Sequence, residues 1–317
     1  MDDKCSCDEV NSIFEQPWWL DIVSGNSWKE IVVNNKNGDC IGRLPYVYIK
    51  RHCINVCTVP LLTQQVGPWI STNSNMKRIA KLKHIKKVSE ELIEKLAHCK
   101  NVDLYFHRKY KYVLPFIWAG YSVEPKFSYV LDDLNNLDSI KSGMESKVRN
   151  LIKNAQKSIV AKEDISDEDL LRLLEATFEK QGRKLPLEKN VVVRIVRESI
   201  SRNSGKVFCA ENISDGKAVA MAFFVYDKNT CYYLLGGKDY TLDIPGCQEL
   251  LLWHGIKFAA TVSTEFDFEG SMIPGIESFF RGFGGKPCIY FRVYRGGLVF
   301  KILNYIKPYI KKMLKYK

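Results

Sequence analysis

Hydrophobic and polar positions along the chain repeat one order of secondary structure twice. In the first half, short runs with alternating apolar residues predict strands, and the Asn37-Gly38 pair between the first two predicts a hairpin turn. Longer runs with apolar residues three and four positions apart predict helices. A short helix ends near Gly25, and three strands, a helix, a strand, a helix and a strand then follow at 28–34, 39–50, 52–60, 76–99, 102–107, 110–119 and 127–131.

The second half repeats this order after three helices of its own, predicted near 145–160, 167–181 and 188–203. Three strands, a helix, a strand, a helix and a strand follow at 206–212, 217–227, 231–237, 247–261, 265–270, 273–283 and 288–294. The halves share almost no residue identity, so the repeat is one of structure. We therefore expect an α/β protein with two similar domains, 1–135 and 136–300, each a mixed, mainly antiparallel sheet flanked by helices.

The helix predicted at 145–160 separates apolar and basic residues onto different faces. Its apolar face repeats at helical spacing and comprises Val148, Leu151, Ile152, Ala155 and Ile159. Arg149, Lys153 and Lys157 recur every fourth residue and form a basic ladder, and Ser146 is a candidate N-cap. The ladder could contact the phosphates of a donor or of a tRNA backbone, or it could be ordinary solvated helix surface.

The net charge of +11 is clustered along the chain. Basic runs without acidic residues occupy 76–88, 146–157 and the last 17 residues. Together they favour an anionic partner such as a phosphate, a nucleic acid or an anionic membrane surface, although each run alone also suits a solvated helix face. The basic amphipathic tail at 301–317 mixes apolar residues with lysines, which predicts either docking on an anionic membrane or a helix packed on the domain.

The composition indicates a globular protein without a metal signature. Hydrophobic residues make up 46% of the chain, no apolar run is long enough to span a membrane, and the acidic N-terminus lacks a secretory pattern, so we expect a cytoplasmic location. The ten cysteines include no C-x-x-C pair and the five histidines lie far apart, so we expect reduced thiols and no bound metal. Without a G-x-S-x-G elbow, a P-loop or a G-x-G-x-x-G fingerprint, hydrolase, nucleoside triphosphatase and dinucleotide-binding functions lack support.

The segment EFDFEGS places unusual polar residues at the end of a predicted strand. Alternation puts Asp267, Glu269 and Ser271 on one side of that strand. A buried strand carries two acids only where they reach a binding site or a cationic partner. We predict these three residues to be catalytic, orienting an amine and relaying its proton; the alternative is a structural ion pair with Arg281 or Arg292.

Two neighbouring segments are candidates for binding a charged donor. At Gly246, Cys247 and Gln248 a loop enters a helix, where free backbone N–H groups and the helix dipole favour a pyrophosphate; a plain turn is the alternative. Arg281 faces away from the apolar stripe of the helix at 273–283 and could reach a phosphate or a carboxylate. We expect the end of the acidic strand, the turn after it and the helix at 273–283 to form one wall of a single site.

Several segments carry a resemblance to a known family. They are SKVRNLIKNAQK at 146–157, YYLLGGKD at 232–239, GCQELLLWHGIKFA at 246–259, FDFEGSMIPGIESFFRGFGG at 266–285 and, more weakly, PLLTQQVGPW at 60–69. Together with the order of elements, they resemble the GNAT acyltransferase fold. The tandem arrangement resembles the Fem-type aminoacyltransferases that build peptidoglycan cross-bridges, and related GNAT-like proteins of bacterial surface-polysaccharide gene sets.

The resemblance implies an acyl-transfer site with an acyl-CoA donor and an amine acceptor. Donor contacts are assigned to Gly246, Cys247, Gln248, Arg149, Lys153 and Arg281, and acceptor contacts to Gln64, Tyr105 and Tyr290. GNAT enzymes that bind acetyl-CoA usually carry a Q/R-x-x-G-x-G/A run before this helix, whereas this chain has YTLDIPGCQEL at 240–250, in which Gly246 alone matches. Fem-type enzymes also lack that run and use aminoacyl-tRNA.

Three functions remain open from the sequence. The first is an N-acyltransferase that moves an acyl group from acyl-CoA to a primary amine of a nucleotide-sugar, polysaccharide or cell-envelope precursor. The second keeps the fold and transfers an aminoacyl group from tRNA to a peptidoglycan precursor. The third is a non-catalytic basic module that binds membrane or nucleic acid. The cytoplasmic location expected above also allows a peripheral position at the inner face of the membrane, and the sequence predicts no particular oligomeric state.

Overall fold

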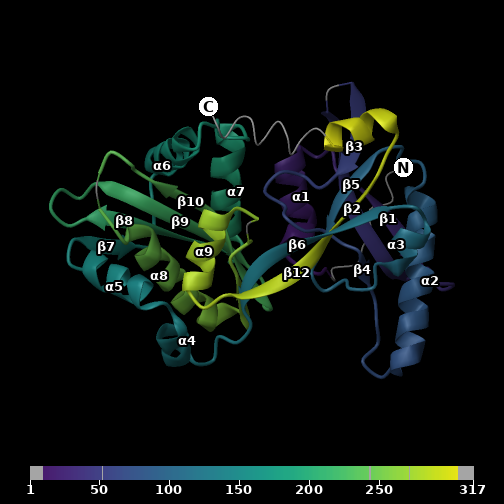
Figure 1. Cartoon of the computed structure of the whole chain (residues 1–317), viewed down its shortest axis with the longest axis horizontal. Helices are drawn as coiled ribbons and strands as arrows, with labels where there is room; N and C mark the ends of the chain where they lie inside the picture. The colour runs from purple at the N-terminus through teal and green to yellow at the C-terminus, as the bar shows by residue number, and fades with distance from the viewer. Residues whose placement is uncertain (1–9, 52, 243, 271, 306–317) are drawn as a thin grey trace. The chain divides into compact units, whose positions relative to one another are not determined.

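The computed structural model describes residues 10–51, 53–242, 244–270 and 272–305 (Figure 1). The chain divides into two compact units, the first comprising residues 1–126 and 290–317 and the second comprising residues 127–289. Both units are built from a mixed sheet with helices against it, which confirms the predicted α/β class. Most of the basic tail expected at 301–317 lies outside the described residues.

The first unit draws its elements from both ends of the chain. In chain order they are a 3₁₀ helix (Ile13–Glu15), α1 (Pro17–Ser24), β1 (Lys29–Asn34), β2 (Cys40–Arg51), β3 (Ile54–Thr58), β4 (Trp69–Ile70), α2 (Arg78–Leu96), β5 (Val102–Phe106), α3 (Leu114–Trp118) and β12 (Lys286–Arg295). The strand order is β1-β2-β3-β5-β12, and β4 pairs with β2. The predicted meander β1-β2-β3 is antiparallel, β5 is parallel to β3, and β12 is antiparallel to β5.

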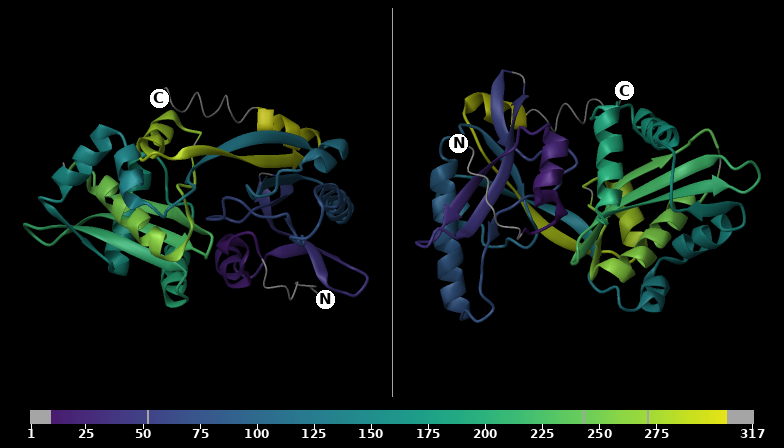
Figure 2. Two further views of the ribbon diagram at one scale, coloured as in Figure 1. Left: turned by 90° about the horizontal axis from the view of Figure 1, so that it is seen from below. Right: turned by 180° about the vertical axis from the view of Figure 1, so that it is seen from behind.

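Helices cover both faces of the sheet in the first unit. Leu44 and Tyr46 of β2 belong to a core that includes Leu92 of α2, whereas the adjacent Val47 packs with Leu20 of α1. Neighbouring residues of a strand point to opposite faces, so α1 and α2 lie on opposite sides of this sheet (Figure 2, right, purple and blue helices).

The second unit contains the remaining elements. They are β6 (Ser122–Leu131), α4 (Leu137–Gly143), α5 (Ser146–Ala155), β7 (Ile159–Lys162), α6 (Asp167–Lys180), α7 (Lys189–Ser201), β8 (Gly205–Asn212), β9 (Ala218–Tyr226), β10 (Thr230–Lys238), α8 (Cys247–Val262), β11 (Glu265–Asp267) and α9 (Pro274–Gly282). The strand order is β6-β11-β10-β9-β8-β7. Only the β10–β11 pair is parallel, and the other neighbours run antiparallel.

Two glycines of β10 let helices approach both faces of this sheet. A Cβ atom on Gly237 would lie 2.7 Å from the backbone of Leu173 in α6. A Cβ atom on Gly236 would lie 3.0 Å from the amide nitrogen of Gln248 in α8. Because these adjacent residues face opposite ways, α6 and α8 flank the sheet on opposite sides (Figure 1).

The two halves of the chain exchange their last strands: β6, from the N-terminal half, belongs to the second unit, and β12, from the C-terminal half, belongs to the first. β12 pairs with β5, with Val293 opposite Leu104, and β6 pairs with β11, with Val130 opposite Asp267. The observed boundaries therefore fall within these two strands, at 126/127 and 289/290, rather than at the expected 135 and 300. A local hydrophobic pattern marks a strand but not its partner, so the sequence does not reveal this exchange.

The largest local difference from the predicted elements concerns the helix expected at 145–160. It ends at Ala155, and Ile159 begins the unpredicted strand β7. The N-cap is Glu145, and Ser146 is the first helical residue. Within the described ranges, no helix is long and apolar enough to cross a membrane, and no group of three His, Cys, Asp or Glu side chains is arranged to hold a metal ion.

Candidate active site

The strands β10 and β11 pair over only three residues. Thr230 to Tyr232 lie opposite Glu265 to Asp267, and β11 then ends, whereas β10 continues through a bulge between Tyr233 and Leu235. A bulge changes the direction and twist of its strand. Ligands of α/β sheets bind beyond the carboxyl ends of parallel strands, so the end of this pairing is the candidate site.

Asp267 closes β11 and is fully buried. β11 lies between β6 and β10 in the sheet, and its Phe266 and Asp267 side chains are fully buried. The Asp267 carboxylate accepts hydrogen bonds from the Ser128 hydroxyl of β6 and, at 2.8 Å, from the backbone N–H of Glu269. Asp267 is therefore held in place by β6 and in turn fixes the residues that follow β11.

The chain turns sharply after Asp267. Glu269 and Gly270 have left-handed backbone angles, with φ of +55° and +44°, and a side chain on Gly270 would overlap the backbone of Ser128. The predicted alternation of Asp267, Glu269 and Ser271 along one extended strand is therefore wrong, because β11 ends at Asp267 and Glu269 lies in a turn. Ser271 lies outside the described residues.

The acid–base behaviour of Glu269 is set by its burial and by a neighbouring carboxylate. Its side chain is half-buried. Burial raises the pKa of Glu269 well above its ordinary value, and the neighbouring Asp267 carboxylate raises this pKa further. A carboxyl group with a raised pKa exchanges its proton closer to neutral pH than an ordinary glutamate, which suits it to general acid–base chemistry.

The start of α8 is packed into the fold. Gly246 has a φ of +83°, and a side chain there would overlap the carbonyl of Leu151 in α5. Cys247 is fully buried and its thiol donates to the Ile244 carbonyl at 3.4 Å. Gln248 donates from its amide to the Tyr233 hydroxyl at 2.9 Å. These contacts join α8 to α5 and β10, so the three predicted donor residues all have structural partners.

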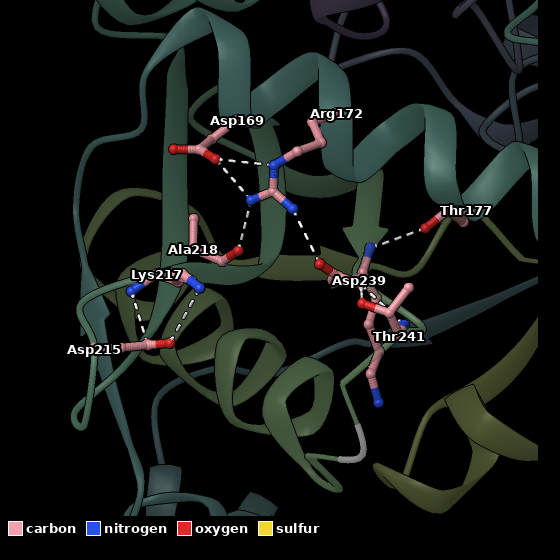
Figure 3. Close-up of polar contacts among 9 residues, drawn as sticks. Asp169, Arg172, Thr177, Asp215, Lys217, Ala218, Asp239 and Thr241 are labelled. Carbon is pink, nitrogen blue, oxygen red and sulfur yellow. Dashed lines mark hydrogen bonds and ion pairs between the residues drawn. The ribbon is translucent and has the colours of Figure 1, made fainter.

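The loop from β10 to α8 is anchored to α6 (Figure 3). Arg172 of α6 donates to the Asp239 carboxylate at 3.1 Å and to the Ala218 carbonyl at 2.7 Å. Thr177, one and a half turns further along α6, accepts a hydrogen bond of 2.9 Å from the backbone N–H of Lys238. The path of the chain into α8 is thus fixed from the opposite side of the sheet.

Arg149 and Lys153 lie on the surface of α5. Arg149 donates to the carbonyls of Ser142 and Met144, which join α4 to α5. With Lys141 and Ser142 of α4, Arg149 lines a shallow pocket of about 380 Å³ that also includes Asp138. Lys153 is exposed. The structure brings Arg149 to a basic surface pocket and leaves Lys153 in solvent.

Arg281 is held by two carboxylates. It donates to Glu277 at 3.1 Å within α9 and to Glu145 at 3.2 Å at the start of α5. The Tyr129 hydroxyl donates to the same Glu277 carboxylate at 2.8 Å. Arg292 pairs in the first unit with Asp103 and Glu124. Both arginines considered as partners for Asp267 are thus engaged with other carboxylates.

The three residues predicted to bind the acceptor all lie in the first unit. Tyr105 of β5 is opposite Arg292 of β12, and Tyr290 lies two residues before Arg292, so both tyrosines belong to one face of the sheet. Gln64 is half-buried in a loop that joins β5 through a 2.8 Å hydrogen bond from the Val66 N–H to the Tyr105 carbonyl. The structure therefore gathers these residues at β5.

Sequence reasoning missed Ser128, Tyr233 and Arg172. Ser128 offers a usable signal, because it is a small polar residue inside the otherwise aromatic and aliphatic strand FSYVL and is fully buried beside Asp267. A buried hydroxyl needs a partner, so such a residue marks a polar contact in the core. Arg172 gives no such signal, since surface arginines on amphipathic helices are common.

The comparisons with known proteins agree with this geometry. Residues 143–280 match the family model of the acetyltransferase (GNAT) domain. No curated protein matches the chain. Among solved structures, FemX shares 11% identity over 89% of this chain and 92% of its own, with a TM-score of 0.68. L-PGS from Bacillus licheniformis shares 12% over 90% of each chain, with a TM-score of 0.54. The C-terminal domain of a putative lysylphosphatidylglycerol synthetase from Agrobacterium fabrum shares 12% over 86% of each, with a TM-score of 0.52.

The fold and the site define the class of protein. The antiparallel meander β8-β9-β10, the parallel strand β11 and the short β10–β11 pairing belong to an acyltransferase domain. Residues 143–280 form a GNAT domain, and the chain as a whole has the fold found in FemX. The resemblance inferred from the sequence is thereby confirmed.

Proposed function

We propose that this chain is an N-acyltransferase that moves an acyl group from acyl-CoA to a primary amine of a nucleotide-sugar, polysaccharide or cell-envelope precursor. The proposal rests on one observation above others. A GNAT domain carries Glu269, a carboxyl group with a raised pKa, at the point where β10 and β11 cease to pair. Acyl transfer to an amine requires a group that accepts a proton near neutral pH at such a point.

The reaction needs no covalent enzyme intermediate, because a thioester is already activated. The amine nitrogen attacks the thioester carbonyl, a C–N bond forms and the C–S bond breaks. The Glu269 carboxylate accepts the proton lost by the nitrogen, and the departing CoA thiolate becomes the thiol by taking up a proton from the Glu269 carboxyl or from water, with Glu269 losing its proton again. Orientation of the two substrates and stabilisation of the developing oxyanion supply most of the rate.

Asp267 is a positioning residue in this proposal. It accepts the Glu269 N–H and the Ser128 hydroxyl, which fixes the turn that presents Glu269. Its carboxylate also raises the pKa of Glu269, which tunes the proton acceptor. Gln248 and Tyr233 fix α8 beside β10 in the same way.

The test is product formation from acetyl-CoA and a panel of amino sugars and nucleotide-linked amino sugars, followed by mass spectrometry across pH. Glu269→Gln should lower kcat by about 100-fold or more, the usual contribution of a general base, with KM little changed. Asp267→Asn removes the negative charge that raises the Glu269 pKa, so the rising limb of the pH–rate profile should move to lower pH. Unchanged turnover in Glu269→Gln would remove this residue from the mechanism.

The second candidate uses aminoacyl-tRNA as the donor and a peptidoglycan precursor as the acceptor. The packing at the start of α8 favours it, because Cys247 is buried and Gly246 abuts the Leu151 carbonyl, and the glycine-rich run of acetyl-CoA enzymes is missing. The net charge of +11 also suits a nucleic-acid donor.

Thermal melting distinguishes the two donors. A ligand at 100 times its Kd adds about 2.7 kcal/mol to stability, which a melt detects. A shift with acetyl-CoA or CoA supports the first proposal. A shift with charged tRNA alone, weakening steeply as salt rises, supports the second. If neither ligand shifts the melt, the non-catalytic alternative replaces both.

A further inference from the structure

The N-terminal half of α2 is an exposed segment that the proposed function does not use. Every residue from 77 to 83 is exposed, and the run 76–88 holds six lysines and arginines and no acidic residue. Two large apolar side chains lie among these cations, with Ile79 70% and Leu82 39% exposed. Isolated exposed apolar residues are ordinary, but apolar residues grouped with cations mark an interaction surface.

The apolar residues share a face of the helix. At 100° per residue, Ile79, Leu82 and Lys86 fall within about 60° of one another around α2. The buried residues Val88 and Leu92, which pack into the core of the first unit, fall on the other side. The N-terminal half of α2 is therefore amphipathic in an unusual way, because it turns apolar side chains towards solvent as well as towards the core.

The short helix α3 extends this face. Leu114, Ile117 and Trp118 are 42%, 45% and 61% exposed, although Phe116 between them is fully buried. The ammonium of Lys86 lies 5.6 Å from the centre of the Trp118 ring, which joins α3 to α2. Aliphatic side chains, a tryptophan and lysines thus meet on one exposed surface of the first unit.

We propose that this surface, formed by Ile79, Leu82, Lys83, Lys86, Leu114, Ile117 and Trp118, docks on a bilayer that contains anionic lipid. Lysine ammonium groups bind lipid phosphates while their methylene stems follow the apolar boundary. Tryptophan and aliphatic side chains enter the region between headgroups and acyl chains. The proposal concerns a binding surface only and stands whether or not the chain transfers acyl groups.

The apolar component favours a bilayer over a nucleic acid. Contacts to a phosphate backbone come from cations, hydroxyls, amides and backbone N–H groups. Five exposed aliphatic and aromatic side chains would add little to such contacts, and on a bilayer each of them leaves water. The basic residues alone suit either partner, so the apolar residues decide between them.

The test is co-sedimentation of the full chain with vesicles of phosphatidylcholine alone or with one third phosphatidylglycerol, together with tryptophan fluorescence. The protein should bind the anionic vesicles with a blue shift in emission, and Trp118→Gln should remove most of that shift. Lys83→Gln with Lys86→Gln should weaken binding about fivefold per lysine. Ile79→Gln with Leu82→Gln should weaken it further at high salt, where the electrostatic part is screened.

Matched controls keep the test specific. Ile213→Gln removes an isoleucine from the second unit that is 59% exposed, and Lys184→Gln with Lys228→Gln removes two exposed lysines from it. Both controls should bind vesicles as the parent does, and all variants should keep its melting temperature.

Three results would overturn the proposal. The first is parent protein that fails to bind anionic vesicles. The second is vesicle binding that survives all the α2 and α3 changes and is instead lost in Leu298→Gln with Ile302→Gln, which would assign docking to the C-terminal segment. The third is tRNA binding that depends on Lys83 and Lys86 in a protein that ignores vesicles, which would assign the surface to nucleic acid.

Discussion

Asp267 and Glu269, the two carboxylates at the end of β11, lie in different environments and therefore have different roles. Asp267 is fully buried and accepts hydrogen bonds from Ser128 and from the Glu269 backbone, so it holds the turn. Glu269 is half-buried with a raised pKa, so it can exchange a proton. The left-handed backbone at Glu269 and Gly270 keeps these side chains from lining up along one strand.

Because the pKa of Glu269 is raised, replacing Glu269 by a neutral residue should increase the stability of the protein by an amount that depends on pH. The folded pKa lies above the unfolded pKa, so the contribution of Glu269 to stability is complete below the unfolded pKa and is lost as pH rises through the folded pKa. Glu269→Gln cannot ionise, so its free energy of unfolding relative to the parent should rise with pH through that window, by about 1.4 kcal/mol per unit of pKa shift, and its melting temperature should rise with it.

Melting curves of both proteins from acidic to alkaline pH measure this difference. A constant difference between Glu269→Gln and the parent at every pH would contradict the raised pKa.

Gly246 offers a second prediction at the residue scale. Gly246→Ala combines a left-handed backbone angle with overlap against the Leu151 carbonyl, so it should lower the free energy of unfolding by about 2–4 kcal/mol. Gly216→Ala has a similar angle, φ +70°, with no atom within 4 Å of the new Cβ, and should cost only about 1 kcal/mol. Urea unfolding of both variants isolates the contact between α5 and α8; equal losses would show that the contact is unimportant.

At the scale of elements, the approach to α8 is set by α6. Arg172 links α6 to β9 and to the loop after β10, and Gly237 lets the α6 backbone lie directly on β10. Tyr233 and Gln248 repeat this link on the opposite face. The end of the β10–β11 pairing is therefore framed by two helices, although its chemistry resides in the turn after β11.

Arg172→Ala should weaken binding of the donor while changing the stability of the protein little. The Arg172 side chain is 42% exposed, so its loss should cost no more than about 1 kcal/mol, yet the freed β10–α8 loop should raise KM for the donor severalfold. Arg172 binds Asp169 as well as Asp239 and one backbone carbonyl. Arg197→Ala is a close match, since Arg197 likewise binds two aspartates and one backbone carbonyl but lies on α7. Steady-state kinetics and melts of both variants are the measurement, and an equal rise in KM would show that the loop is not specifically involved.

The order of elements could be predicted from the sequence because apolar residues repeat at one spacing in strands and at another in helices. Both meanders, the helices α2, α6 and α8, and the strand before α9 lie where the pattern places them. The end of β11 could not be predicted from the sequence, because Phe266 and Phe268 continue the strand-like alternation of apolar residues while the backbone turns at Glu269. The sequence singles out Asp267 and Glu269, which the structure places at the end of β11, but not Ser128, which holds Asp267 and is 139 residues away from it in sequence.

At the scale of the whole molecule, the exchanged strands make each half of the chain depend on the other. The core of the first unit includes Val293 of β12, which comes from the C-terminal half. The core of the second unit includes Tyr129 and Leu131 of β6, which come from the N-terminal half. Without its exchanged strand each sheet would lose a packed strand and gain an open edge at β5 or β11.

The dependence of the halves predicts how fragments behave. Residues 1–135 and 136–317, produced separately, should each lack a cooperative thermal transition, because each is deprived of core side chains and of a strand's hydrogen bonds. Produced together, the fragments should associate and recover a transition close to that of the intact chain. Fragment 136–317 also lacks Ser128, so only the two fragments together should show the pH-dependent contribution of Glu269 to stability. Cooperative melting of either fragment alone would mean that its own half suffices, and the exchanged strand would then serve to join the units rather than to complete them.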